Sequence, residues 1–383
     1  MPLPSTKTAP TKPHLAHIPE LDGIRGIAAL MVFCHHLFFT SVPNPERWNG
    51  FVVLASRLSQ AGGNGVDLFF VLSGFLITSL LVLDRGSPHY YWNFYWKRAL
   101  RIFPLYLVAL VLLLVFWPAT WQYTLLSFLF IANFAQVFHV TSAGPFWTLA
   151  IEEQFYLIWP RFAGSFDVAR LERLALALVI LSPVLRLVAA AFGHHDFEFT
   201  FFHCDGLALG AMLACQQVRT NSINSQIASA RTATFRQPLL WLIAIALIAL
   251  PFALSLRFDS ESRVIFAAIA IQVSGISLLA YCIIAAAVRN TGSSLLAVFR
   301  SRLLTFFGLI SYCLYIANGY VVTLYDHFRG PMQTGNMQQY TIRAAAVFAA
   351  TLVVCILSRY LIELPAMRMR KHVLRRFIRT RKE

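Results

Sequence analysis

Arg25 and His36 lie eleven residues apart in the first apolar segment of the sequence. Eleven helical steps of about 100° return to within about 20° of the starting direction, and eleven rises of about 1.5 Å separate the side chains by about 16 Å along the axis. An arginine suits phosphate or another anion, whereas a neutral imidazole suits proton transfer. The spacing therefore predicts that both face one cavity at two depths. A structural, hydrogen-bonded histidine is the alternative for His36, and it is the preferred interpretation of His35, which points about 100° away.

A second basic pair, Arg98 and Arg101, follows an aromatic run at residues 90–96. Residues three apart are neighbours on one helix face, so these guanidinium groups could jointly hold a polyphosphate. The alternative is membrane anchoring, because aromatic residues and cations collect at membrane interfaces. We expect residues 90–101 to form an interfacial helix on the cytoplasmic surface.

Glu152 and Glu153 are adjacent carboxylates in an otherwise apolar segment. Adjacent residues cannot face the same way on a helix, so at least one is expected to enter the protein interior. There it could pair with an arginine or hold a hydroxyl substrate. A purely structural ion pair is the alternative.

Asp67 and Ser73 follow a glycine-rich stretch, residues 62–65, which we expect to be flexible backbone at a cavity mouth on the external side. In the first turn of a helix, Asp67 suits capping as well as it suits catalysis. Ser73 and Gly74 are small enough for close helix packing, and we prefer that interpretation to a nucleophile site.

Membrane-spanning helices must hold these side chains. Of the 383 residues 58% are apolar and 13% charged, and the mean hydropathy is +0.63, whereas a soluble chain carries about 25% charged residues. Stretches able to cross about 30 Å of hydrocarbon recur along the whole chain. They lie at residues 24–42, 65–83, 102–117, 173–192, 200–217, 238–256, 264–288, 303–324 and 341–362. Ionisable residues inside them, which also include Arg186, Asp205 and Arg359, are functional candidates by default.

Residues 121–162 hold two apolar stretches separated by the polar residues 139–145. If this region makes one net crossing and the N-terminus is inside, internal segments hold 24 Lys and Arg residues and external segments five. This asymmetry follows the positive-inside rule, whereas two crossings would place the eight cations of residues 363–383 outside. We therefore predict an all-α integral membrane protein with about ten transmembrane helices, one broken or re-entrant segment, and both termini in the cytoplasm.

The net charge of +15 lies mainly on the predicted cytoplasmic segments, where anionic lipid headgroups explain it better than nucleic acid does. The six cysteines fall within predicted spans and indicate packing rather than disulfides, and no metal-ligand spacing occurs. We divide the chain into a cytoplasmic tail (residues 1–20), a membrane domain (residues 21–366) and a basic cytoplasmic tail (residues 367–383).

Several short motifs occur in a fixed order along nearly the whole chain. They are residues 22–25 with His36, residues 65–70 with 73–75, Arg98 with Arg101, and residues 147–156, 205–206, 311–315 and 362–365. Each is weak alone. Together they resemble acyltransferase family 3, the bacterial membrane O-acyltransferases that modify cell-surface glycans, peptidoglycan and some secreted small molecules.

This resemblance implies a ten-helix domain of the bacterial inner membrane that takes an acyl group, commonly acetyl, from cytoplasmic acyl-CoA and delivers it to an acceptor hydroxyl outside. The phosphates of coenzyme A would lie among Arg25, Arg98 and Arg101. The catalytic group would comprise His36, Arg25, Glu153 and Asp22. His36 would be either the general base for the acceptor hydroxyl or a carrier of the acyl group, and the sequence does not separate the two.

On the acceptor side or in supporting roles we place Asp67, Ser73, Glu152, Asp205 and Asn318. Members of the family often have a histidine where this chain has Asn318, and an amide cannot act as a base near neutral pH. We expect no bound cofactor or metal, acyl-CoA as co-substrate, and a carbohydrate or glycolipid acceptor such as lipopolysaccharide, exopolysaccharide or peptidoglycan. The extracytoplasmic hydrolase-like domain fused to some members is not expected, so either a partner protein completes transfer or this domain acylates directly.

A secondary transporter of a polar or anionic solute is the alternative function, because it would also have about ten helices, a broken segment and buried charges. Transporters often show internal repeats, and we find no repeated motif or second broken segment in the sequence. A non-catalytic scaffold would leave Arg25, His36 and the Arg98 and Arg101 pair unexplained.

Overall fold

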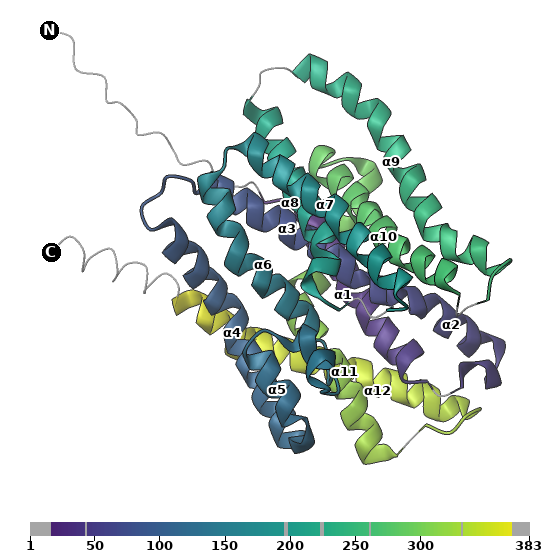
Figure 1. Cartoon of the computed structure of the whole chain (residues 1–383). Helices are drawn as coiled ribbons and strands as arrows, with labels where there is room; N and C mark the ends of the chain where they lie inside the picture. The colour runs from purple at the N-terminus through teal and green to yellow at the C-terminus, as the bar shows by residue number, and fades with distance from the viewer. Residues whose placement is uncertain are drawn as a thin grey trace, which may run out of the picture.

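The computed structural model describes residues 17–42, 44–194, 198–222, 226–259, 262–330 and 332–369, and all regular structure within these ranges is helical. Ten helices in this part of the chain have 16 residues or more (Figure 1). They are α1 (Pro19–Cys34), α3 (Gly65–Leu83), α4 (Tyr90–Phe116), α6 (Phe146–Ser165), α7 (Val168–Ala191), α8 (Thr200–Ser222), α9 (Gln226–Ser255), α10 (Arg263–Arg289), α11 (Arg302–Arg329) and α12 (Met337–Ser358). Most of both predicted tails, residues 1–16 and 370–383, lies outside the described residues.

Shorter helical elements connect the long ones. Two are α-helices, α2 (Gly50–Gln60) and α5 (Trp121–Phe128), and two are π-helical, η1 (His35–Thr40) and η7 (Arg359–Glu363). The 3₁₀ segments are η2 (Pro45–Arg47), η3 (Ala61–Asn64), η4 (Pro118–Thr120), η5 (Ala132–Phe138) and η6 (Ser294–Arg300).

Eight stretches of the described residues are long and apolar enough to cross a membrane, and they contain α1, α3, α4, α7, α9, α10, α11 and α12. Helices α6 and α8, of 20 and 23 residues, are not among these eight stretches. Large apolar side chains are exposed on the outer helix faces, for example Val111 (59%), Leu242 (65%) and Leu361 (70%). Such surfaces suit lipid rather than water. The chain is therefore a multi-pass membrane protein.

Glycines permit the closest helix contacts at the centre of the bundle. A Cβ atom at Gly26 of α1 would lie 2.1 Å from the carbonyl oxygen of Leu304 in α11. One at Gly74 of α3 would lie 1.9 Å from the carbonyl oxygen of Leu207 in α8. No larger residue allows the two backbones to approach so closely. The predicted packing role of Gly74 is confirmed.

The glycine-rich residues 62–65 do not form the flexible loop expected from the sequence. They lie in η3 and at the start of α3, packed against α1. A Cβ atom at Gly62 would lie 2.2 Å from the carbonyl oxygen of Met31, and one at Gly65 would lie 2.5 Å from that of Ala28. These glycines bring α3 close to α1 and so fix the position of α3.

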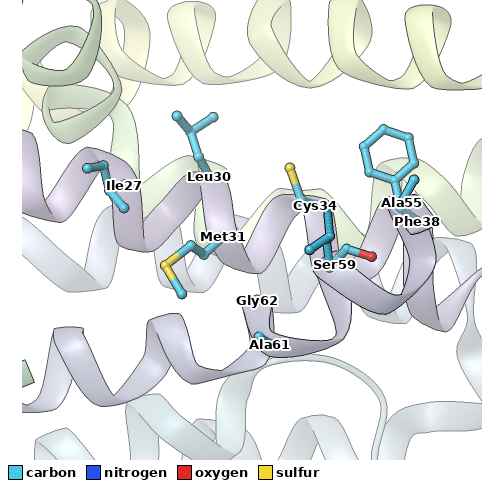
Figure 2. Close-up of a pocket in the computed structure, with 10 residues that line it drawn as sticks. Ile27, Leu30, Met31, Cys34, Phe38, Ala55, Ser59, Ala61 and Gly62 are labelled. Atoms are coloured by element: carbon cyan, nitrogen blue, oxygen red, sulfur yellow. The ribbon is translucent and has the colours of Figure 1, made fainter. Parts of the chain in front are cut away.

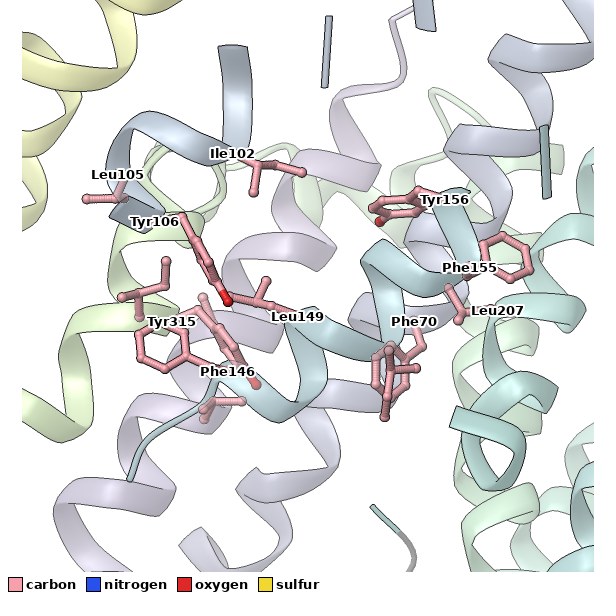
Figure 3. Close-up of a cluster of buried hydrophobic side chains, with 14 of the residues drawn as sticks. Phe70, Ile102, Leu105, Tyr106, Phe146, Leu149, Phe155, Tyr156, Leu207 and Tyr315 are labelled. Atoms are coloured by element: carbon pink, nitrogen blue, oxygen red, sulfur yellow. The ribbon is translucent and has the colours of Figure 1, made fainter. Parts of the chain in front are cut away.

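The broken segment predicted within residues 121–162 is present. The eight residues of α5 span only about 12 Å, too little to cross a bilayer, and η5 follows without continuing the helix. Helix α6 then runs unbroken for 20 residues. It lies inside the bundle, where Tyr106 of α4, Phe146 and Tyr156 of α6, and Tyr315 of α11 belong to one buried cluster (Figure 3).

The separate interfacial helix expected at residues 90–101 is not observed. These residues form the first half of α4, which continues through Pro104 to Phe116. The hydroxyl of Tyr95 donates to the carbonyl oxygen of Leu157 at 2.9 Å, which ties this half to α6. Arg98 and Arg101 therefore project from a helix that enters the bundle.

Candidate active site

His36 lies in the π-helical turn η1, which continues α1. Its Nδ1 atom is 2.9 Å from the carbonyl oxygen of Val32. Because a carbonyl oxygen can only accept, Nδ1 carries the hydrogen, and Nε2 of the neutral ring is left with a lone pair. π-helical turns are rare and frequently occur at functional sites. The local backbone thus fixes the tautomer in which Nε2 is the basic atom.

Side chains bind the carbonyl groups that lose their helical partners in this turn. Oγ of Ser41 donates to the carbonyl oxygen of His36 at 2.6 Å. Nη1 of Arg343, in α12, lies 3.4 Å from the carbonyl oxygen of Leu37, and its Nε and Nη2 atoms bind both carboxylate oxygens of Asp326 at 2.7 and 2.8 Å. The sequence placed Arg343 within a span but gave it no role, whereas the structure places it against the His36 turn.

The side chain of His36 lines a cavity of about 400 Å³. Gly319 of α11 lies against the imidazole, because a Cβ atom there would be 3.5 Å from Cδ2 and 4.0 Å from Nε2. Gly144, with φ of 112°, lies against the side chain of Tyr320. The hydroxyl of Tyr320 donates to the carbonyl oxygen of Ala143 at 2.8 Å. The cavity is thus built where η1, the end of α4 with η4, α11 and the connection before α6 meet.

Arginines gather nearer the opposite end of α1. Nη1 of Arg25 donates to Oδ1 of Asp22 at 3.0 Å. Cζ of Arg98 lies 4.4 Å from the ring centre of Tyr156, a cation–π contact. Arg25, Arg98 and Arg101 are within electrostatic range of one another. The fold therefore brings together three cations from two helices, a group suited to a multiply charged anion.

Glu152 lies beside these cations and inside the bundle. Its Oε1 accepts a hydrogen bond from Ser73 of α3 at 3.0 Å, and its Oε2 accepts one from Tyr156 at 2.8 Å. Both Glu152 and Glu153 are within electrostatic range of Arg98. Glu152 thus enters the interior, as expected for at least one of the pair. Ser73, interpreted from the sequence as a packing residue, is instead a hydrogen-bond donor to this carboxylate.

Polar groups also occupy the space between the two ends. Oγ1 of Thr148 and the hydroxyl of Tyr315 are 2.6 Å apart in the buried core. Thr148 lies one turn before Glu152 on α6, and Tyr315 lies one turn before Gly319 on α11, so each is next to one end of the site. We call this series of groups, from Arg98 through Glu152 and Tyr315 to His36, the polar column. It extends from the arginines to the imidazole of His36.

A family profile described as an acyltransferase domain, that of acyltransferase family 3, matches residues 18–360. This chain belongs to that family. It is 32% identical over 166 residues to the peptidoglycan O-acetyltransferase OatA of Listeria monocytogenes, a match that covers 38% of this chain and 24% of the relative. It is 32% identical over 200 residues to the putative peptidoglycan O-acetyltransferase YrhL of Bacillus subtilis, which covers 46% of this chain and 29% of the relative.

A third relative is the O-acetyltransferase OatA of Staphylococcus aureus, 29% identical over 167 residues, or 38% of this chain and 24% of that protein. The matched part of this family 3 acyltransferase domain spans about a quarter of the length of these relatives. No solved structure matches the chain significantly.

Two predicted site residues of this acyltransferase domain lie in a separate buried cluster. Asp67 does not cap α3, because Oδ1 instead accepts a hydrogen bond from Ser277 of α10 at 3.1 Å. Asp205 of α8 forms an ion pair with Arg186 of α7, with 2.6 Å between Oδ2 and Nη2. These contacts join α3, α7, α8 and α10, which indicates that the cluster holds helices together.

Two further predictions concern the neighbours of the site. Asn318 is buried, and its Nδ2 donates to the carbonyl oxygen of Tyr315 at 3.1 Å, while the next residue, Gly319, meets the imidazole of His36. Nδ1 of His35 lies 3.2 Å from the carbonyl oxygen of Ser59, at the end of α2. The contacts of His35 fit its predicted structural role.

A second cavity, of about 440 Å³, lies between α1 and α2 (Figure 2). Its lining includes Leu30, Met31, Cys34 and Phe38, with one hydroxyl from Ser59, and includes no charged side chain of the described residues. The residues described as lining this apolar groove include no counterpart of the imidazole and the arginines of the polar column.

Proposed function

We propose that the chain is a membrane O-acyltransferase that moves an acyl group, expected to be acetyl, from cytoplasmic acyl-CoA to a hydroxyl of a carbohydrate outside the cytoplasm. The observation that carries the proposal is the polar column, which has three arginines at one end and His36 at the other. The relatives named as peptidoglycan O-acetyltransferases favour acetyl and make a cell-envelope glycan the first acceptor to test.

The donor binds at the arginine end. Coenzyme A carries several phosphate charges and cannot enter lipid, so its head binds Arg25, Arg98 and Arg101 at a membrane surface. The excess of Lys and Arg on the same side of the predicted topology makes that surface the cytoplasmic one, with ten crossings and both termini inside. The pantetheine arm then extends along the polar column and carries the thioester towards His36.

The chemical step requires a base at the acceptor. Nε2 of His36 takes the proton of the acceptor hydroxyl while the hydroxyl oxygen attacks the thioester carbonyl carbon. The carbon–sulfur bond breaks, an ester forms, and the proton passes from the imidazolium to the departing thiolate of coenzyme A. In a second route the Nε2 lone pair attacks the thioester first, the carbon–sulfur bond breaks and the thiolate of coenzyme A leaves. The resulting acyl-imidazolium transfers its acyl group to the hydroxyl oxygen, and the proton of the hydroxyl passes to the thiolate. The hydrogen bond from Nδ1 to Val32 supports both routes.

Inside-out membrane vesicles given radiolabelled acetyl-CoA test the proposal, with label counted in macromolecular and lipid-linked glycan. His36→Ala should lower turnover by about 10² to 10⁴, the usual contribution of a general base. His35→Ala, at equal amounts in the membrane, is the matched control and should retain most of the activity. Full turnover by His36→Ala would refute the assignment of the base. Label that enters the vesicles without covalent incorporation would favour the transporter alternative.

A further inference from the structure

We propose that the cavity at His36 is the acceptor subsite, and that it selects a neutral, hydroxyl-rich ring such as one sugar unit of a glycan. The inference rests on the proposed function, in which His36 is the base. In this proposal the acceptor contacts side chains that are not part of the sequence motifs, above all Trp117, Thr120 and Thr323. Three properties of the cavity support it.

The first property is the direction of the hydrogen bonds. Besides Tyr320, four hydroxyl side chains line the cavity, and each donates its own hydrogen to a backbone carbonyl. They are Thr40 and Ser41, which donate to His36 at 3.2 and 2.6 Å, Thr120, which donates to Trp117 at 2.8 Å, and Thr323, which donates to Gly319 at 2.9 Å. A hydroxyl has one hydrogen and two lone pairs, so these four oxygens remain as acceptors. Nε2 of His36 is a fifth acceptor. A ligand that satisfies them must donate several hydrogens, as a polyol does.

The second property is the absence of charge. The residues described as lining the cavity include no Asp, Glu, Lys or Arg. A lipid phosphate or an ionic solute would find no counter-charge among these residues. The lining of this cavity differs in this respect from the arginine end of the polar column. Its lack of charged side chains restricts the occupant to a neutral group.

The third property is a fixed aromatic wall. The rings of Trp117 and Tyr320 are 5.9 Å apart at an angle of 37°, and the bond from the Tyr320 hydroxyl to Ala143 holds the second ring in place. One face of a sugar ring presents apolar C–H bonds, whereas its hydroxyls project from the edge. The ring face can therefore pack on the aromatic wall while the edge meets the hydroxyl oxygens. A volume of about 400 Å³ is typical of a small-molecule site and suits one sugar unit of a longer glycan.

Binding can be measured without any acyl donor. The intact protein in lipid nanodiscs is titrated with the N-acetylglucosamine disaccharide, and contact is detected by saturation-transfer NMR. Trp117→Leu, which keeps an apolar side chain but removes the aromatic face, should raise Kd about three- to tenfold. Thr120→Val and Thr323→Val, which replace only the hydroxyl, should each raise Kd about three- to tenfold. Trp117→Phe should bind nearly as well as the intact protein, and elution profiles of the solubilised variants establish that they are folded.

The chain offers matched controls for both kinds of change. Thr305 is on the same helix as Thr323 and donates to Ser301 in the same way, at 3.0 Å, but does not line the cavity. Trp121, which is 57% exposed, also lies outside the cavity. Thr305→Val and Trp121→Leu should leave Kd unchanged.

Two outcomes would overturn the proposal: no saturation transfer to the disaccharide from the intact protein, or equal Kd values in the cavity variants and the controls. Acyl transfer measured in parallel separates this proposal from the proposed function. Binding without acyl transfer would retain the subsite and refute the reaction. Transfer with an unchanged acceptor KM in Trp117→Leu would retain the reaction and refute the subsite.

Discussion

Two of the groups of charged side chains within the helix bundle differ in how their charges are satisfied. Arg186 and Asp205 are 0% and 2% exposed, and the guanidinium also donates to Ser274 and to the carbonyl oxygens of Phe202 and Ala270. At the arginine end of the polar column, Arg98 and Arg101 form no direct ion pair with another described residue.

The difference separates charges that the protein itself satisfies from charges that it leaves available to a ligand. A buried cation whose donors are all used by the protein has nothing left for a ligand, and removing it leaves an uncompensated partner. Cations that repel one another and retain unused donors are stabilised when an anion joins them. The sequence placed Asp205 in a membrane span and Arg98 in an interfacial helix, and neither position showed which of the two charges the protein itself satisfies. Their surroundings in the structure do.

The largest expected effect is the loss of folded protein when the paired cluster is broken. Arg186→Met leaves Asp205 buried without a counter-charge, which typically costs about 3 to 5 kcal/mol. We expect a low yield of folded protein and early thermal unfolding after solubilisation. The double variant Arg186→Met with Asp205→Leu should recover part of that stability. A single variant with the thermal stability of the intact protein would remove the basis for calling this cluster structural.

The next effect is on donor binding. Arg98→Gln combined with Arg101→Gln should fold normally but raise the KM for acetyl-CoA about 10²- to 10⁴-fold, because the variant loses one charge-assisted hydrogen bond from each arginine and each contributes about 1.5 to 3 kcal/mol. The measurement is the initial rate of label transfer as acetyl-CoA is varied. Arg170→Gln, which removes only an exposed ion pair with Asp167, is the control and should have no effect. An unchanged KM in the double variant would show that the donor binds elsewhere.

The smallest effect concerns Arg343, which resembles Arg186 in its pairing but also contacts the His36 turn. Arg343→Met should lower kcat about tenfold through displacement of the imidazole, with the KM for acetyl-CoA unchanged. Arg343→Lys keeps the charge but loses the two-pronged contact with Asp326, so it should recover only part of kcat. A rise in KM without a change in kcat would contradict a positioning role.

Local periodicity and span length could be read from the sequence alone. Apolar segments of sufficient length predicted the long helices, and the polar interruption at residues 139–145 predicted the break before α6, because both follow from the bilayer as solvent. That Arg25 and His36 face one cavity stays a prediction from rotation along one helix, because the described lining of the His36 cavity does not include Arg25. The prediction of an interfacial helix at residues 90–101 was wrong because α4 runs on from these residues into the following span, through Pro104.

Contacts between helices were decided by the tertiary structure. Ser73 and Glu152 are 79 residues apart in sequence, yet they share a hydrogen bond, whereas Asp67 is drawn towards Ser277. The direction of each hydroxyl in the His36 cavity depends on which carbonyl lies within reach. Sequence therefore determined the residues available, the helices that carry them and the depth of each along its helix. Only the packing of the helices determined which of those groups form hydrogen bonds or ion pairs with one another and which are left available to a ligand. The reason is that such contacts depend on how closely separate helices approach, at glycine contacts such as those of Gly26 and Gly74.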